Sequence, residues 1–226
     1  MTSVAPNGPA GTLRGTTVVE VAAPNTAYAG GLLADLGARV LLVESSELAT
    51  SGGRRAFREL IVDADVLLEA EPPGRLAELG IDYIDLTRRS PRTGAPDMTP
   101  GPPAVNDRLI HVSITPFGRT SRGPMSTSSR QQPMTDLTMQ ARAGWLGFHG
   151  HGPGSPMNAT PTDVAARMAV MATLTALITR EHHGGQFVDV SMVAAANTCA
   201  GPATVRWLAA RSLGVPRRLS DQQQRQ

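Results

Sequence analysis

The stretch PTDVAARMAVMATLTALITREHHGGQFVDVSM, residues 161–192, decides the fold class of this chain. Its first part has apolar residues at steps of three and four from Val164 to Ile178, which is the period of a helix. Basic residues and the pair Gly184 and Gly185 follow, as they do where helices end. Residues 186–192 then alternate and are rich in valine, so they predict a strand. A helix that leads directly into a strand is typical of α/β proteins.

Asp163 stands at the predicted start of this helix, after a break at Pro161 and Thr162. A carboxylate at this position meets the positive end of the helix dipole and backbone N–H groups without a partner inside the helix. It can therefore serve as the N-cap of the helix, which is a frequent role of aspartate. The same environment keeps the carboxylate ionised and can hold an anionic group close by. The residues alone leave both roles open.

The rest of the chain repeats this alternation of strands and helices. The predicted strands cover residues 17–22, 39–44, 65–69 and 108–115. The predicted helices cover residues 27–36, 55–62, 75–79, 84–88, 135–145, 163–183 and 194–213. A strand, a helix and a strand at this spacing form a βαβ unit, whose crossover is right-handed in nearly all proteins. We therefore predict an α/β fold with a Rossmann-like, mostly parallel sheet flanked by helices.

One large domain should span residues 14–216, with an irregular Pro/Gly-rich loop at residues 90–107 inside it. Residues 1–13 and 217–226 are predicted to be flexible ends. Glu44 closes the second strand, as an acidic residue does in dinucleotide-binding proteins. The turn after the first strand reads APNTAYAGG, however, and lacks the GxGxxG pattern, so the sequence gives little support to a nicotinamide cofactor.

The composition argues against several classes of function. All 21 basic residues are arginine, so no lysine is available as a Schiff base or a general base. The arginines are scattered and aromatic residues make up 4% of the chain, which argues against nucleic-acid binding. The histidines do not have the spacing of zinc ligands, so we expect no metal site.

The composition also bears on location. Cys199 is the single cysteine, so no disulfide can form within the chain, which suits a reducing compartment. The first dozen residues lack the pattern of a signal peptide, and no apolar run of transmembrane length is evident. We predict a cytoplasmic protein without a membrane partner.

Four segments, in this order, resemble a known family. They are GTTVVEVAAPNTAYAGGLLADLGARVLLVE at residues 15–44, ADVLLEAEPPGRLAELGIDY at 64–83, RLIHVSITPFGRTSRGP at 108–124, and the stretch at 161–192. Together they resemble the family III CoA-transferases, the formyl-CoA and carnitine CoA-transferase family, which also includes α-methylacyl-CoA racemases. The resemblance implies the large domain of that fold, and we expect the family's small domain to be absent.

The resemblance also implies roles for individual residues. In the family an aspartate just before the long helix is the covalent nucleophile, and Asp163 holds that position. CoA is then a substrate, shared between an acyl-CoA and a carboxylic acid, and no cofactor is permanently bound. The positions that imply contact with CoA are occupied by Ala23, Pro24, Asn25, Thr26, Pro73 and Gly74.

Three positions depart from the family pattern, because Ser45, Pro72 and Glu78 stand where arginines that bind phosphates are common. The first reading is a CoA-transferase with an aspartyl intermediate, acting alone or as one subunit of a heteromer. The second is a non-catalytic partner subunit or a degenerate member of the family. A racemase is the third and weakest, because its second catalytic group, a histidine, is replaced by Thr135. The resemblance further implies a homodimer, or a heterodimer with a family-related chain.

Overall fold

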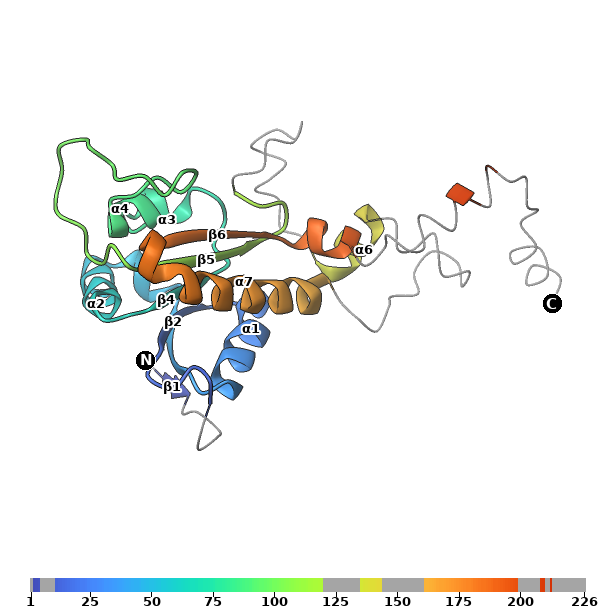
Figure 1. Cartoon of the computed structure of the whole chain (residues 1–226), viewed down its shortest axis with the longest axis horizontal. Coiled ribbons are helices and arrows are strands. Elements are labelled where there is room, and N and C mark those ends of the chain that lie inside the picture. Colours follow the sequence, from blue (N-terminus) through green and yellow to red (C-terminus); the bar gives the residue numbers. More distant parts are fainter. Residues whose placement is uncertain are drawn as a thin grey trace.

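The structure is a computed structural model that describes residues 2–4, 11–119, 135–143, 161–198, 208–209 and 212. Within these residues six strands form one sheet in the order β1-β3-β2-β4-β5-β6 (Figure 1). They are β1 (Thr2–Val4), β2 (Thr17–Ala22), β3 (Arg39–Glu44), β4 (Val66–Glu69), β5 (Ile110–Thr115) and β6 (Gln186–Ser191). Strands β2 to β6 are parallel, and β1 pairs antiparallel with β3 at one edge. The predicted Rossmann-like, mostly parallel α/β fold is confirmed.

Helices cover both faces of this sheet (Figure 1). On one face lie α1 (Pro24–Asp35) and α7 (Pro161–His183), and α6 (Asp136–Arg142) contacts α7. On the other lie α2 (Ser51–Val62), α3 (Arg75–Glu78), α4 (Tyr83–Thr87) and the 3-10 helix η1 (Glu47–Ala49). Successive side chains of each strand point to opposite faces of the sheet. In β4, Val66 and Leu68 pack under α1 and α7, whereas Leu67 packs under α2.

The connection into β6 departs from the usual handedness of parallel crossovers. The chain moves from β2 to β3 in one direction along the sheet and from β5 to β6 in the opposite direction. The helices that lead into β3 and β6, α1 and α7, nevertheless lie on the same face and pack together. The two crossovers therefore have opposite hands, although nearly all are right-handed. This exception brings the start of α7 next to the start of α1.

Several predicted boundaries are wrong. α1 begins at Pro24 rather than at residue 27. α2 begins at Ser51 rather than at residue 55, because Thr50 caps it by accepting a hydrogen bond from the N–H of Gly53 at 2.9 Å. Residues 2–4 pair with β3 and Leu13 is buried, so these parts of the predicted flexible segment 1–13 belong to the folded domain, whereas residues 1 and 5–10 lie outside the described residues.

Two further predictions concern residues that the structure describes only in part. The predicted tail at residues 217–226 lies outside the described residues. Of the predicted helix 194–213, residues 194–198, 208–209 and 212 are described, and all of these are helical. The loop at residues 90–107 is fully described and contains no helix and no strand, apart from a single bridge between Arg89 and Pro96.

Helix α7 is long and apolar enough to cross a membrane when only length and composition are considered. The sequence-based statement that no apolar run reaches this length is therefore wrong. The helix packs along β5, β6 and α1, and most of its buried residues are alanines. The core helix of a soluble protein meets the same criterion, so α7 is weak evidence for a membrane span.

A buried carboxyl group lies between the sheet and α1. Glu20 of β2 is 3% exposed, and the hydroxyl of Thr26 donates to its Oε1 at 2.8 Å. Burial raises the pKa of Glu20 above its usual 4.5. Gly30 of α1 lies directly over this group, because a Cβ atom at residue 30 would be 1.9 Å from Glu20 Oε2. The helix can therefore lie this close to the sheet only because residue 30 has no side chain.

Replacement of Gly30 by alanine should destabilise the protein, while the same replacement at Gly31 should not. A methyl group at residue 30 overlaps the Glu20 carboxyl, which should cost about 1–3 kcal/mol. Among the described residues, no atom outside the local backbone of the helix lies within 4 Å of a Cβ at residue 31, so Gly31→Ala should leave stability unchanged or raise it by about 0.5–1 kcal/mol. Urea unfolding of both variants gives the comparison, and equal stabilities would contradict the packing of α1 on Glu20.

Glu20 should also make stability depend on pH. Its pKa is higher in the folded protein than in the unfolded chain, so the folded state holds this proton more tightly. The free energy of unfolding should therefore fall as the pH rises from 4.5 through the raised pKa, and this fall should be missing in Glu20→Gln. Urea unfolding of both proteins between about pH 4 and pH 8 tests this. If the free energy of unfolding changes with pH in the same way in both proteins, the Glu20 carboxyl is not the source of the pH dependence.

Candidate active site

The carboxyl ends of the parallel strands form one edge of the sheet, and the predicted binding residues follow two of these ends. β2 lies between β3 and β4. The chain leaves β2 through α1 on one face and leaves β3 through α2 on the other. The strand order therefore reverses at β2, and open α/β sheets bind ligands at such a switch point. Residues 23–26 follow β2 and residues 70–74 follow β4, so both segments flank this point.

Ala23, Pro24, Asn25 and Thr26 form the N-cap and the first turn of α1. Proline suits the first helical position, where an N–H group would have no partner. Thr26 is fully buried, and its hydroxyl donates to Glu20 and accepts from the N–H of Ala23 at 3.2 Å. Its side chain fixes α1 on the sheet and does not face a ligand. Pro24 is exposed, whereas Ala23 and Asn25 are half-buried.

Asp163 is the third residue of α7 and is half-buried. The prediction that it stands at the first position of the helix is wrong, because α7 already begins at Pro161. Asp136 of α6 forms two hydrogen bonds with this end of the helix. Its Oδ1 accepts from the N–H of Thr162 at 3.0 Å and from the Thr162 hydroxyl at 2.7 Å. Asp163 therefore lies inside the first turn, still at the positive end of the helix dipole.

One contact ties the second turn of α7 to α1. Arg167, four residues after Asp163, donates from Nη2 to the hydroxyl of Tyr28 at 3.0 Å. Its guanidinium carbon lies 5.2 Å from the centre of the Tyr28 ring. Tyr28 in turn follows Thr26 by two residues in α1. Asp163 precedes this contact by four residues in α7, and the segment 23–26 ends two residues before it in α1, so both belong to helices on the same face of the sheet.

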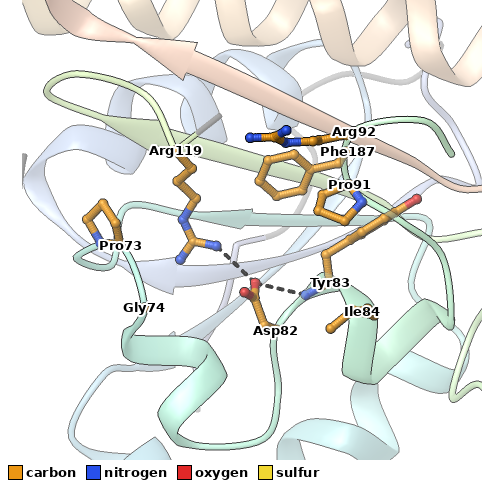
Figure 2. Close-up of a pocket in the computed structure, with 9 residues that line it drawn as sticks. All are labelled: Pro73, Gly74, Asp82, Tyr83, Ile84, Pro91, Arg92, Arg119 and Phe187. Atoms are coloured by element: carbon orange, nitrogen blue, oxygen red, sulfur yellow. Dashed lines mark hydrogen bonds and ion pairs between the residues drawn. The ribbon is translucent and has the colours of Figure 1, made fainter. Parts of the chain in front are cut away.

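The second predicted segment opens onto a cavity of about 350 Å³ (Figure 2). Gly74 has a left-handed backbone with φ of 94°, which turns the chain into α3 and places no side chain in the cavity. The cavity lies between this turn, the start of α4, the segment after β5 and the start of β6. Its lining residues are Pro73, Gly74, Asp82, Tyr83, Ile84, Pro91, Arg92, Arg119 and Phe187.

Arg119 is a charged residue that lines this cavity, and its side chain is 9% exposed. Its Nη1 donates to Asp82 Oδ1 at 2.9 Å, as Figure 2 shows, and its Nε lies 3.8 Å from Glu69 Oε1. Its backbone N–H donates to the carboxylate of Asp189 at 2.9 and 3.0 Å. These contacts link the end of β4, the segment after β5 and the middle of β6 to the start of α4.

A fully buried polar pair supports the same wall. Glu69 and His111 are both 0% exposed, and Glu69 Oε1 lies 3.3 Å from His111 Nε2. The other oxygen of Glu69 accepts from the N–H of Glu71 at 2.7 Å, which fixes the chain as it leaves β4. The rings of His111, Tyr83 and Phe187 pack with centre-to-centre distances of 5.2 to 6.0 Å. The turn with Pro73 and Gly74 is therefore held from below.

The structure brings the predicted residues into two groups and not into one cavity. Asp163 and residues 23–26 lie at the α1/α7 face, whereas Pro73 and Gly74 line the cavity under α4. Sequence reasoning missed Arg119, Asp82 and the buried pair Glu69 and His111. The position of Arg119 just after a buried strand was the available signal, because side chains that follow parallel strands meet at one edge.

Metal binding finds no support in the described part of the chain, where no three His, Cys, Asp or Glu side chains are grouped to hold an ion. Thr135, which matches the second catalytic group of the racemases, caps α6 by accepting from the N–H of Thr138 at 3.3 Å. Its role in the structure is therefore that of a helix cap.

The comparisons of this chain with known proteins all point to one family. The model of CoA-transferase family III matches residues 45–93 and 102–225, which is more than half of the chain. The succinyl-CoA:(R)-benzylsuccinate CoA-transferase subunit BbsE of Thauera aromatica is 35% identical over 154 residues, or 66% of this chain and 32% of that protein. The acetyl-CoA:oxalate CoA-transferase of Acetobacter aceti is 26% identical over 230 residues, or 85% of this chain and 54% of that protein. The chain thus spans from about a third to about half of the length of these two relatives.

Solved structures show the same fold. A CAIB/BAIF family protein from Brucella suis matches with a TM-score of 0.71 and 23% sequence identity, covering 88% of this chain and 58% of that one. At this identity the likeness establishes the fold, and the match of the family model establishes the relationship in sequence. The chain belongs to CoA-transferase family III.

Proposed function

We propose that this chain transfers coenzyme A from an acyl-CoA to a carboxylic acid, with Asp163 as the covalent nucleophile. The observation that carries the proposal is the position of Asp163 in the first turn of α7, on the same face as the first turn of α1. In a member of this family, a carboxylate at the positive end of two neighbouring helices suits both attack and the binding of an anionic substrate.

The chemistry needs only the carboxylate and the two substrates. A carboxylate oxygen of Asp163 attacks the thioester carbonyl carbon, the C–S bond breaks, CoA leaves as a thiolate, and a mixed anhydride of Asp163 with the acyl group remains. The thiolate then attacks the Asp163 carbonyl carbon, which releases the donor acid and forms an aspartyl–CoA thioester. The acceptor carboxylate attacks that thioester, and the thiolate returns to the acceptor carbonyl, which frees Asp163. Covalent catalysis divides one difficult exchange into easier steps.

The names of the relatives suggest which substrates to test first. Succinyl-CoA is named for the Thauera aromatica subunit and for a mouse succinyl-CoA:glutarate CoA-transferase, which is 28% identical over 151 residues. The acids named are benzylsuccinate, glutarate and oxalate, each with two carboxyl groups. We therefore propose succinyl-CoA as the donor and a dicarboxylic acid as the acceptor.

A second candidate is a partner subunit without catalysis of its own. Two relatives are named as subunits, the Thauera aromatica protein and the beta subunit of a succinyl-CoA–L-malate CoA-transferase of Chloroflexus aurantiacus. Ser45, Pro72 and Glu78 at the positions of family arginines agree with such a role. Assembly as a homodimer, or as a heterodimer with a family-related chain, belongs to the proposal, and so does a cytoplasmic location.

Replacement of Asp163 should abolish transfer without loss of the fold. Asp163→Asn keeps the size of the side chain and removes the nucleophile, so transfer from succinyl-CoA to glutarate should fall by about a thousandfold or more. Asp35→Asn is the matched control, because Asp35 is an exposed aspartate at the far end of α1. It should keep the activity of the unaltered chain.

The assay also separates the two candidates. An unaltered chain that is inactive alone but active with a family-related chain is expected for a heteromer, and Asp163→Asn within that assembly then tests this subunit. Full activity of the assembly with Asp163→Asn would assign catalysis to the other chain. Full activity of Asp163→Asn in a chain that is active alone would contradict the role of Asp163.

A further inference from the structure

The side chain of Arg167 in α7 is exposed but is held in place by α1. Its Nη2 donates to the Tyr28 hydroxyl at 3.0 Å, and its guanidinium carbon lies 5.2 Å from the centre of the Tyr28 ring. No other hydrogen bond and no ion pair of this side chain is found within the described residues. A guanidinium group has five N–H donors, so most of those of Arg167 remain available to an anion.

Arg167 follows Asp163 by one helical turn. Residues four apart in a helix are neighbours on one face, with Cβ atoms about 5–6 Å apart. Helical side chains also lean toward the N-terminus of their helix, which brings Arg167 toward the turn that carries Asp163. The guanidinium group is bonded to Tyr28, and no ion pair joins it to Asp163. A fixed cation therefore stands beside the proposed nucleophile without neutralising it.

Two arginines that follow carboxyl ends of strands are already paired within the protein. Arg119, after β5, pairs with Asp82 at 2.9 Å, and Arg75, after β4, pairs with Glu78 at 3.5 Å. Arg167 is paired with no carboxylate among the described residues. Of these three arginines, Arg167 alone can therefore bind an external carboxylate without giving up an internal one.

The distance between Arg167 and Asp163 suits the second carboxylate of a dicarboxylic acid. In the proposed reaction, Asp163 is joined to the carbonyl carbon of each acid in turn. Succinate carries its second carboxylate two methylene groups from this carbon, and glutarate carries it three methylene groups away. One helical turn advances by about 5.4 Å, which is of the same size as these separations. The CoA arm extends from the other side of the carbonyl carbon and is not needed at Arg167.

We propose that Arg167, held in place by Tyr28, binds the second carboxylate of the substrate and so selects dicarboxylic over monocarboxylic acids. The inference rests on the proposed function, which supplies the dicarboxylic acids and the place of attack. A guanidinium group binds a carboxylate through charge-assisted hydrogen bonds, which are stronger than those between neutral groups. The contact with Tyr28 reduces the rotamer freedom that an arginine would otherwise lose on binding. The same contact serves donor and acceptor, because both acids pass through Asp163.

Transfer of CoA from succinyl-CoA to glutarate and to pentanoate tests this, with the full chain and any partner chain it needs. Pentanoate has the carbon chain of glutarate but a single carboxylate, so the unaltered chain should prefer glutarate. Arg167→Ala should lower kcat/KM for glutarate about 10–100-fold, mainly through KM, and leave kcat/KM for pentanoate unchanged. Tyr28→Phe keeps the ring and removes the hydroxyl, so it should raise the KM for glutarate less and leave kcat unchanged. Arg39→Ala is the matched control, because Arg39 is exposed at the opposite end of the strands and its loss changes the net charge equally.

The pair of acids separates this inference from the proposed function. Equal losses with glutarate and pentanoate would overturn the inference, since Arg167 would then act on Asp163 or on the fold. An Arg167→Ala variant that keeps its preference for glutarate would overturn it too, and so would an unaltered chain without such a preference. Each of these results would leave transfer through Asp163 intact. An unaltered chain that transfers CoA to neither acid would overturn both proposals.

Discussion

The packing of α7 against α1 is the interaction on which the candidate site depends. Both helices present small residues to their shared core, including Ala29 of α1 and Ala165, Ala166 and Ala169 of α7. Small side chains allow two helices to approach closely, because the distance between helix axes follows the size of the residues in contact. Close packing on one face requires a crossover into β6 of the less common hand. Without it, Asp163 would lie on the other face of the sheet from the first turn of α1.

The same packing brings the N-terminal ends of two helices to one face of the sheet. Arg167 in the second turn of α7 donates a hydrogen bond to Tyr28 in the second turn of α1. Asp136 of α6 accepts a hydrogen bond from the backbone N–H of Thr162 at the start of α7. On the opposite face, the buried pair Glu69 and His111 fixes the chain that leaves β4.

Local sequence accounts for much of the fold. The strands at residues 17–22 and 39–44 are predicted with correct ends, because apolar runs and a helix closed by Gly37 bound them sharply. The start of α7 is misplaced by two residues, since Pro161 looks like a break in the sequence but is a good first residue of a helix. Pairing of residues 2–4 with β3 involves residues distant in sequence and is invisible to local pattern.

The candidate site is less predictable than the fold. Asp163 and the segments at residues 23–26 and 73–74 can be found from the resemblance to the family. The inward direction of the Thr26 side chain cannot be found in this way, because it depends on the carboxyl group of Glu20, which is buried beneath the helix. The pairing of Arg119 with Asp82 likewise joins residues 37 positions apart. The neighbourhood of Arg167 and Tyr28 depends on the face that α7 occupies, which no local pattern determines.

The most direct test of the account is mass spectrometry of the chain, with any partner chain it needs, after brief mixing with succinyl-CoA in the absence of an acceptor acid. The account predicts that a CoA group becomes joined to the protein through a thioester, that the modified peptide contains Asp163, and that adding glutarate removes the group. A CoA group attached at another residue, or transfer to glutarate without modification of Asp163, would contradict it.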